Sequence, residues 1–154
     1  MNSPNLSPIW VPHVVVAAIV EHEGKFLLVE EETGDGLRLN QAAGHWERSE
    51  TLLEAVVREA LEETAHHVEP VALLGCYTTT NAARNITYLR FAYVCTSSGV
   101  DLNRRLDSGI VRTLWLTPHE LAASSTPHRS PLVMRCVQDY LSGPRYPLEF
   151  VTHL

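Results

Sequence analysis

The sequence contains few cysteines, which leaves little scope for disulfides or a cysteine-based metal site. The 154 residues include only three cysteines, Cys76, Cys95 and Cys136, which lie far apart and form no C-x-x-C pair. An odd number of scattered cysteines favours reduced, mostly buried thiols over disulfides or zinc ligands. We therefore expect the reducing environment of a cytoplasm.

Long apolar runs and a secretion leader are also missing. No apolar segment approaches the length of a membrane span, so we expect no membrane partner. Residues 1–12 contain three prolines and lack the basic segment and apolar core of a signal peptide. We expect residues 1–11 to form a flexible N-terminal arm. Residues 12–154 should form a single domain that is long enough to bury a core.

Positive charge is scarce. The chain has 12 lysines and arginines against 18 aspartates and glutamates, a formal net charge of −6, and Lys25 is its only lysine. This balance argues against a nucleic-acid partner, whose phosphates would require a basic surface. Arginine pairs through two N–H groups with phosphate or carboxylate, so the bias suits an anionic ligand, although a GC-rich genome would produce it too. Nothing in the composition demands more than a monomer.

What the sequence does contain is a set of short strands interrupted by two long helices. The first expected strand, residues 13–21, is β-branched and continuously apolar, as in a strand buried on both faces. Thr117 and Pro118 should begin a short helix through Ala122, and a longer helix should lie within residues 129–142. The order predicts an α/β protein with a mixed sheet and helices on both sides. The remaining strands are expected at 26–31, 37–43, 68–79, 86–96 and 110–116.

The central stretch is residues 44–66, GHWERSETLLEAVVREALEETAH. Its second half has helical periodicity, with Ser49 as a plausible N-cap. Glu59, Glu62 and Glu63 fall on an arc of about 100° beside the apolar stripe. Carboxylates this close repel one another unless a cation or an arginine lies among them, and such oxygen ligands suit Mg²⁺ or Mn²⁺. A solvated acidic helix face is the alternative. The stripe expected to be buried comprises Leu53, Val56, Val57, Ala60, Leu61 and Thr64.

The order of charges in this stretch resembles the Nudix box, G-x5-E-x7-R-E-U-x-E-E-x-G-U, where U is a bulky aliphatic residue. Six charged or glycine positions match at the required spacing: Gly44, Glu50, Arg58, Glu59, Glu62 and Glu63. Ala60 is a small substitute for the first aliphatic residue. The last glycine and aliphatic positions are occupied by Ala65 and His66. Without glycine a left-handed cap is costlier, so we expect the helix to run on by a residue or two.

The resemblance extends over residues 12–150. PHVVVAAIVEHEGKFLLVEEE, LNQAAGHWE and the tail RSPLVMRCVQDYLSGPRYPLEF are similar to one branch of the Nudix family, the NudJ-type phosphatases. The resemblance implies the Nudix fold, an α/β/α sandwich. It also implies Mg²⁺-dependent hydrolysis of small-molecule diphosphates, namely nucleoside tri- and diphosphates and the pyrimidine diphosphate precursor of thiamine.

The family pattern also implies roles for individual residues. Glu59 and Glu63 should ligate the metal, Glu62 should ligate it or bridge to it through water, and the Gly44 carbonyl could complete the set. Arg58 should pair with Glu50 and hold Glu59 in place, because an arginine cannot act as a base. A carboxylate, with Glu59 as the first candidate, should deprotonate the attacking water.

Four further residues are weaker candidates. Gln41 and His45 lie near Gly44 and could face substrate, or they could be ordinary strand-end residues. Arg90 could meet a phosphate or face solvent. Asp107 precedes the last strand, where Nudix enzymes often carry another acid, although a turn aspartate is the alternative.

Two other functions remain open. A catalytically silent nucleotide-binding module would keep the fold but would typically have lost one of the glutamates. An isomerase acting on an isoprenoid diphosphate would share the box, but the tail argues against it. The physiological substrate depends on the loops at 32–36, 81–85 and 97–108, whose conformations do not follow from the sequence.

Overall fold

The computed structural model describes residues 8–154, so residues 1–7 of the predicted arm lie outside the described residues. Residues 8–12 have no regular structure and lead into the first strand, with Ile9, Trp10 and Val11 exposed. The strands are β1 (His13–His22), β2 (Lys25–Thr33), β3 (Gly36–Asn40), β4 (Ala42–His45), β5 (His66–Asn81), β6 (Ile86–Val100) and β7 (Ile110–Leu116). The helices are α1 (Leu52–Thr64), α2 (Pro118–Ala122) and α3 (Leu132–Ser142), followed by a 3-10 turn at Leu148–Phe150.

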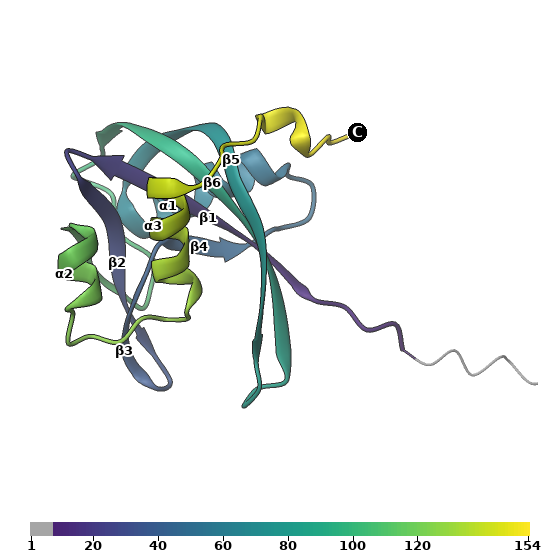
Figure 1. Ribbon diagram of the computed structural model, residues 1–154, viewed down its shortest axis with the longest axis horizontal. Helices are drawn as coiled ribbons and strands as arrows, with labels where there is room; N and C mark the ends of the chain where they lie inside the picture. Colours follow the sequence, from purple (N-terminus) through teal and green to yellow (C-terminus); the bar gives the residue numbers. More distant parts are fainter. Residues whose placement is uncertain (1–7) are drawn as a thin grey trace, which may run out of the picture.

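The strands form one mixed sheet in the order β3-β2-β1-β6-β5, with β4 pairing with β1 and β7 pairing with β2 (Figure 1). β1 and β6 run parallel, and the other pairs are antiparallel. In the register of this sheet, Val15 of β1 lies opposite both His45 of β4 and Arg90 of β6. The pairing therefore brings the box glycine strand and Arg90 to the same end of β1.

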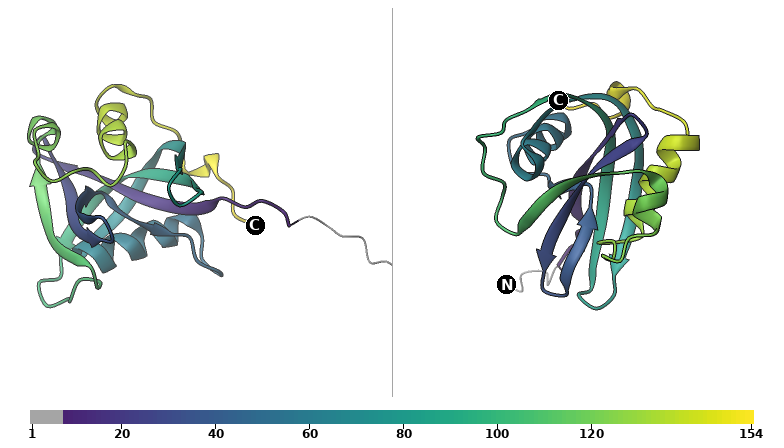
Figure 2. Two further views of the ribbon diagram at one scale, coloured as in Figure 1. Left: turned by 90° about the horizontal axis from the view of Figure 1, so that it is seen from below. Right: turned by 90° about the vertical axis from the view of Figure 1, so that its left-hand side faces the viewer.

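Helices cover both faces of the sheet, as the sequence predicts. Val16, Ala18 and Val20 of β1 pack in the core beneath α1, whereas Ala17 and Ile19 pack beneath α2 and α3. The left-hand view of Figure 2 shows α1 on one side of the sheet and α2 and α3 on the other. β1 is apolar throughout its centre because its side chains alternate between two cores. The predicted α/β/α sandwich is confirmed.

Helix α1 begins later than predicted, and a different residue caps it. Thr51 is the N-cap: its hydroxyl accepts a hydrogen bond from the Glu54 N–H at 3.1 Å, and the Glu54 carboxylate accepts one from the Thr51 N–H at 2.7 Å. This reciprocal capping box satisfies two backbone donors at the helix start. Ser49 has a φ of 71° and lies outside the helix, so the predicted Ser49 cap is wrong.

The buried face of α1 is also rotated from the predicted stripe. Leu53, Val57 and Leu61 are only partly buried and line an open apolar groove on the outer side of the helix with Pro70. Periodicity alone could not choose between two adjacent apolar faces. As a result, Glu59 lies on the buried face of the helix. The buried residues are Leu52, Ala55, Val56, Glu59, Ala60 and Thr64.

The helix ends where the glycine of the box would end it. Ala65 adopts the left-handed conformation, with φ 59° and ψ 13°, and its N–H donates to the Leu61 carbonyl at 2.9 Å. The predicted extension of the helix is therefore wrong: the cap geometry is retained, and the alanine carries its conformational cost. His66 is buried at the start of β5, with its ring edge-on to Trp115 at 5.8 Å between centroids.

Three smaller boundary predictions also differ. The strand expected at 37–43 is divided into two strands. The first, β3, pairs with β2, and the second, β4, pairs with β1. β5 begins at His66, two residues before the strand expected at 68–79, and β6 continues to Val100, into the loop expected at 97–108. Of the cysteines, Cys95 and Cys136 are buried, Cys76 is exposed, and all three are free.

Among residues 8–154, none of the helices combines the length and the apolar character needed to cross a bilayer.

Candidate active site

Gly44 of β4 lies directly against Glu59 of α1. A Cβ atom on this residue would overlap the Glu59 carboxyl group. The missing side chain thus leaves the space into which Glu59 projects from the buried face of α1. This contact supplies a physical reason for glycine at the first position of the box.

Arg58 gathers the surrounding carboxylates. Its Nε and Nη2 atoms donate to both oxygens of Glu50, at 3.0 and 2.7 Å, and its Nη1 donates to Glu59 at 2.8 Å and to Glu62 at 3.1 Å. Nη2 also donates to the His45 carbonyl at 3.0 Å. The predicted pairing of Arg58 with Glu50 is present, and its two hydrogen bonds fix the orientation of the guanidinium. These contacts raise the pKa of Arg58 and lower that of Glu50.

Glu63 follows Glu59 by one turn of α1 and is partly buried. It accepts a hydrogen bond from the Ala43 N–H at 2.9 Å, and burial raises its pKa to about 8. Burial likewise raises the pKa of Glu59, against the opposing effect of Arg58. The negative charge of Asp107 adds to both shifts, and that of Glu31 adds to the shift of Glu63. A buried carboxyl group surrounded by other carboxylates is a place where a cation would be strongly favoured.

The donor set fits a hard divalent cation, although the carboxylates are not gathered around one point. Among residues 8–154, no three histidine, cysteine, aspartate or glutamate side chains already converge as a metal-binding group. Arg58 Nη1 lies between Glu59 and Glu62 and neutralises them in the way a cation would. The residues therefore fit a magnesium site in chemistry: only oxygen donors and a space kept open by Gly44.

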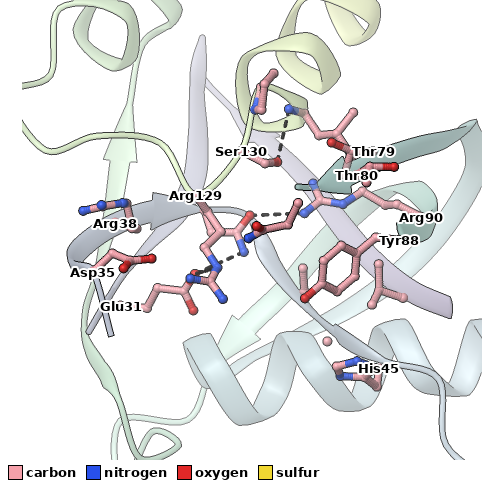
Figure 3. Close-up of a pocket in the computed structure, with 17 residues that line it drawn as sticks. Glu31, Asp35, Arg38, His45, Thr79, Thr80, Tyr88, Arg90, Arg129 and Ser130 are labelled. Atoms are coloured by element: carbon pink, nitrogen blue, oxygen red, sulfur yellow. Dashed lines mark hydrogen bonds and ion pairs between the residues drawn. The ribbon is translucent and has the colours of Figure 1, made fainter. Parts of the chain in front are cut away.

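A cavity of about 370 Å³ opens beside Gly44, on the side of the sheet that faces α3. It is bounded by the β5–β6 hairpin, by β3, and by the segment before α3 (Figure 3). Three arginines, Arg38, Arg90 and Arg129, line it together with Glu31 and Asp35. Arg129 Nε lies 3.4 Å from a Glu31 oxygen, so this arginine already has a carboxylate partner. The lining is largely polar and suits a charged ligand.

The structure places the weaker candidates at different distances from this cavity. His45 and Arg90 line it, and Asp107 stands near Glu59 and Glu63. His45 Nε2 lies 3.0 Å from His13 Nδ1, and burial followed by the charge of His13 lowers the pKa of His45. Gln41 is 1% exposed: its Nε2 donates to the Val133 carbonyl at 2.8 Å, and its Oε1 accepts from Arg90. Gln41 therefore lies beneath the cavity floor, where it orients Arg90.

Sequence reasoning missed Glu31 and the Arg129–Ser130 segment. Glu31 lies in the run of glutamates at the end of β2, where alternation leaves it half-buried while Glu32 is exposed. Arg129 and Ser130 open the tail that carried the family resemblance, which was the available signal. Only the fold shows that this tail borders the same cavity as Gly44.

Comparison with known proteins identifies the class. The NUDIX domain model matches residues 11–136, and the chain belongs to the Nudix hydrolase family, whose enzymes act on small-molecule diphosphates. Phosphatase NudJ of Escherichia coli K12 is 39% identical over 140 residues, covering 91% of this chain and 90% of that protein.

Solved structures agree with this assignment. A NUDIX hydrolase from Nitrosomonas europaea superposes with a TM-score of 0.90 and 45% identity, covering 94% of this chain and 98% of that one. A MutT NUDIX hydrolase from Burkholderia pseudomallei shares 21% identity with a TM-score of 0.71, over 83% of this chain and 99% of that one, which is a likeness of fold. The chain is thus an enzyme of the Nudix hydrolase class.

Proposed function

We propose that this enzyme is a Mg²⁺-dependent phosphohydrolase of nucleoside tri- and diphosphates and of the thiamine-related pyrimidine diphosphate. The observation that carries the proposal is the meeting of two features at Gly44: the inward-facing carboxylates of α1 and the arginine-lined cavity. The substrate classes rest on the similarity to Phosphatase NudJ, which spans most of both chains. Mn²⁺ would suit the same oxygen donors.

In this proposal Glu59, Glu62 and Glu63 hold the metal, with the Gly44 carbonyl completing the set. When bound, Mg²⁺ supplies charge neutralisation at the phosphate oxygens and makes a water molecule more acidic. Arg58 keeps Glu59 and Glu62 oriented through Nη1, while Glu50 fixes the other edge of its guanidinium. Arg58 and Glu50 are therefore positioning residues, because they hold the metal ligands in a fixed orientation.

Glu59 is the candidate general base. It lies against Gly44, which lines the cavity, and burial raises its pKa, so it is a better proton acceptor than an exposed glutamate. In the reaction, a water oxygen bonds to phosphorus, the bridging P–O bond breaks, and Glu59 accepts the proton of the water. His45 and Arg90 would contact the substrate from the cavity wall.

The test is release of orthophosphate and pyrophosphate from a substrate panel, with and without Mg²⁺. The panel contains nucleoside tri- and diphosphates, the pyrimidine diphosphate, thiamine diphosphate and a dinucleoside polyphosphate. We expect metal-dependent orthophosphate release, reduced by about 10²–10³-fold in Glu63→Gln. Glu32→Gln, at an exposed position on β2, is the matched control and should retain activity.

Other results would replace the proposal. Hydrolysis of dinucleoside polyphosphates alone would be consistent with the proposed metal-dependent mechanism but would contradict the proposed NudJ-type substrates. No release across the panel, with Mg²⁺ still bound, would favour a catalytically silent nucleotide-binding module.

We further propose, from composition and length, a single domain over residues 12–154 that acts as a monomer in the cytoplasm.

A further inference from the structure

Arg90 is a buried cation without an acidic partner. Its residue is 6% exposed, and among residues 8–154 no carboxylate lies within 4.0 Å of its guanidinium. Nη1 donates to the Gln41 amide oxygen at 3.2 Å and Nη2 to that of Asn40 at 3.4 Å. Nε is buried, and no residue in the described range 8–154 accepts a hydrogen bond from it. Two long hydrogen bonds to neutral groups leave the positive charge largely uncompensated.

Such a group is costly to bury, so its retention calls for an anion that arrives from outside. An unpaired buried charge is disfavoured far more than a paired one, and burial accordingly lowers the pKa of Arg90. The other lining arginine near it, Arg129, is paired with Glu31. Arg38 also lines the cavity and forms no ion pair among residues 8–154, but it is only partly buried, so Arg90 is the buried cation of the cavity that remains available to a ligand.

The cavity around Arg90 is better suited to a phosphoryl group than to a ring. Ser130, Pro131 and Leu132, at the start of the 11-residue helix α3, line it together with Thr79 and Thr80 of β5 (Figure 3). The positive end of the helix dipole and the nearby hydroxyl groups favour an anion. Among the lining residues the aromatic surface comes from Tyr88, which lies beside Arg90, and from the His45 ring further away (Figure 3).

We infer that the substrate binds with its terminal phosphoryl group pointing inward to Arg90 and the N-terminus of α3, and with its organic part toward solvent. This inference deepens the proposed function and rests on it. Water oxygen would bond to the terminal phosphorus, and the bridging oxygen would leave with the organic product. The products are orthophosphate and a compound shortened by one phosphate. The required ligand feature is a free terminal phosphate, because an ester on it would have to enter the polar end of the cavity.

The first test compares matched substrates. A nucleoside diphosphate and the same compound with a methyl ester on its terminal phosphate are assayed with Mg²⁺. We expect kcat/KM to fall by about 10²-fold or more for the ester, because a blocked phosphate loses one charge and meets the cavity wall. Equal rates for the two compounds would overturn the inward orientation while leaving the hydrolase proposal intact.

The second test removes the arginine. Arg90→Met should lower kcat/KM for the free-ended substrate by about 10²-fold, and Arg90→Lys should lower it less, mainly through KM, because lysine keeps the charge but loses the planar fork. Tm of Arg90→Met should not fall below that of the wild type, since an uncompensated charge has been removed. Arg135→Met is the matched control: this arginine is exposed on α3 and pairs with Asp139.

A binding measurement separates the subsite from catalysis. Inorganic phosphate added to the metal-free protein should raise the Tm of the wild type and of Arg135→Met, but not that of Arg90→Met. If Arg90→Met responds to phosphate and hydrolyses substrate like the wild type, the subsite is refuted and the hydrolase remains. If the wild type hydrolyses nothing in the panel, the proposed function fails, and the phosphate-dependent shift still decides the subsite. Should Arg90→Met fail to fold, the KM effect of Arg90→Lys decides.

Discussion

Two arginines on opposite faces of the sheet differ in how their charge is neutralised. Arg58, on α1, lies within 4.0 Å of four glutamates, Glu47, Glu50, Glu59 and Glu62. Within the described part of the chain, the guanidinium of Arg90, on β6 beneath α3, donates only to the amide oxygens of Gln41 and Asn40. Both lie close to the strand that carries Gly44. The charge of Arg58 is neutralised within the protein, whereas the charge of Arg90 would be neutralised only when an anion is bound.

The difference shows how a site for a polyanion and a metal can divide its charges. The α1 side holds excess negative charge around Glu63, which a cation would relieve. The α3 side holds excess positive charge at Arg90, which a phosphate would relieve. A metal-bound diphosphate would satisfy both at once, with Gly44 and Ala43 between them. Replacing Arg58 should therefore damage the fold, while replacing Arg90 should damage only function.

The largest effect should come from filling the space between the two regions. In Gly44→Ala the new methyl group would displace the Glu59 carboxylate, so we expect kcat/KM to fall by about 10²–10³-fold and stability to fall by roughly 1–3 kcal/mol. Gly34→Ala is the control, because a Cβ there meets only the Arg84 side chain at 3.6 Å. Kinetics and urea unfolding measure the two effects. Full activity in Gly44→Ala would show that Glu59 need not lie against the glycine.

The second effect separates the arginines by stability. Arg58→Met leaves the surrounding glutamates unpaired, so unfolding should become easier by roughly 2–3 kcal/mol, less than for a fully buried pair because Arg58 is 23% exposed. Activity should also fall by about 10–100-fold through the loss of ligand orientation. Parallel urea unfolding of Arg58→Met and Arg90→Met makes the comparison. Equal destabilisation of the two would mean that Arg90 is a structural arginine like Arg58.

A smaller effect should follow from Glu31, which connects the two regions. It pairs with Arg129 and raises the pKa of Glu63 through its charge. Glu31→Gln should increase the Mg²⁺ concentration needed for half-maximal rate by about 10-fold, the size expected for a residue that supports metal ligands. Mg²⁺ titration of the rate measures it, beside the exposed Glu32→Gln. An unchanged titration would leave Glu31 as a partner of Arg129 alone.

The smallest effect is expected at the helix end. Ala65→Gly relieves a left-handed alanine, worth about 1 kcal/mol, but removes a buried methyl group of similar value. We therefore expect stability to change by less than about 1 kcal/mol and turnover to stay within about twofold, because the geometry of the cap already matches that of glycine. Thermal unfolding and steady-state kinetics test this. A large gain in turnover would show that Ala65 disturbs the ligands.

The sequence predicted the sandwich because its signals are local patterns. The alternation of apolar residues in β1 and the capping signals of α2 act over a few residues. The buried face of α1 was mispredicted because Leu53, Val57 and Leu61 are as apolar as the residues that the sheet covers. Only tertiary packing selects between such faces.

The cavity was less predictable still. Gln41, a candidate for facing substrate, is buried beneath Arg90. Its amide oxygen accepts from Arg90 of β6, and its amide N–H donates to the carbonyl of Val133 in α3, 92 positions away in the sequence. Glu31 and Arg129 meet only after β2 and the segment before α3 are brought together. The helix end was mispredicted for the opposite reason: Ala65 adopts a strained conformation that the surrounding fold imposes.

The most direct test is the identity of the phosphate released from a nucleoside triphosphate in Mg²⁺ and in a chelator. We expect orthophosphate and the nucleoside diphosphate in Mg²⁺, no pyrophosphate, and no reaction in the chelator. Release of pyrophosphate would contradict the inward orientation of the terminal phosphate, and hydrolysis undiminished by the chelator would contradict the role of the α1 carboxylates.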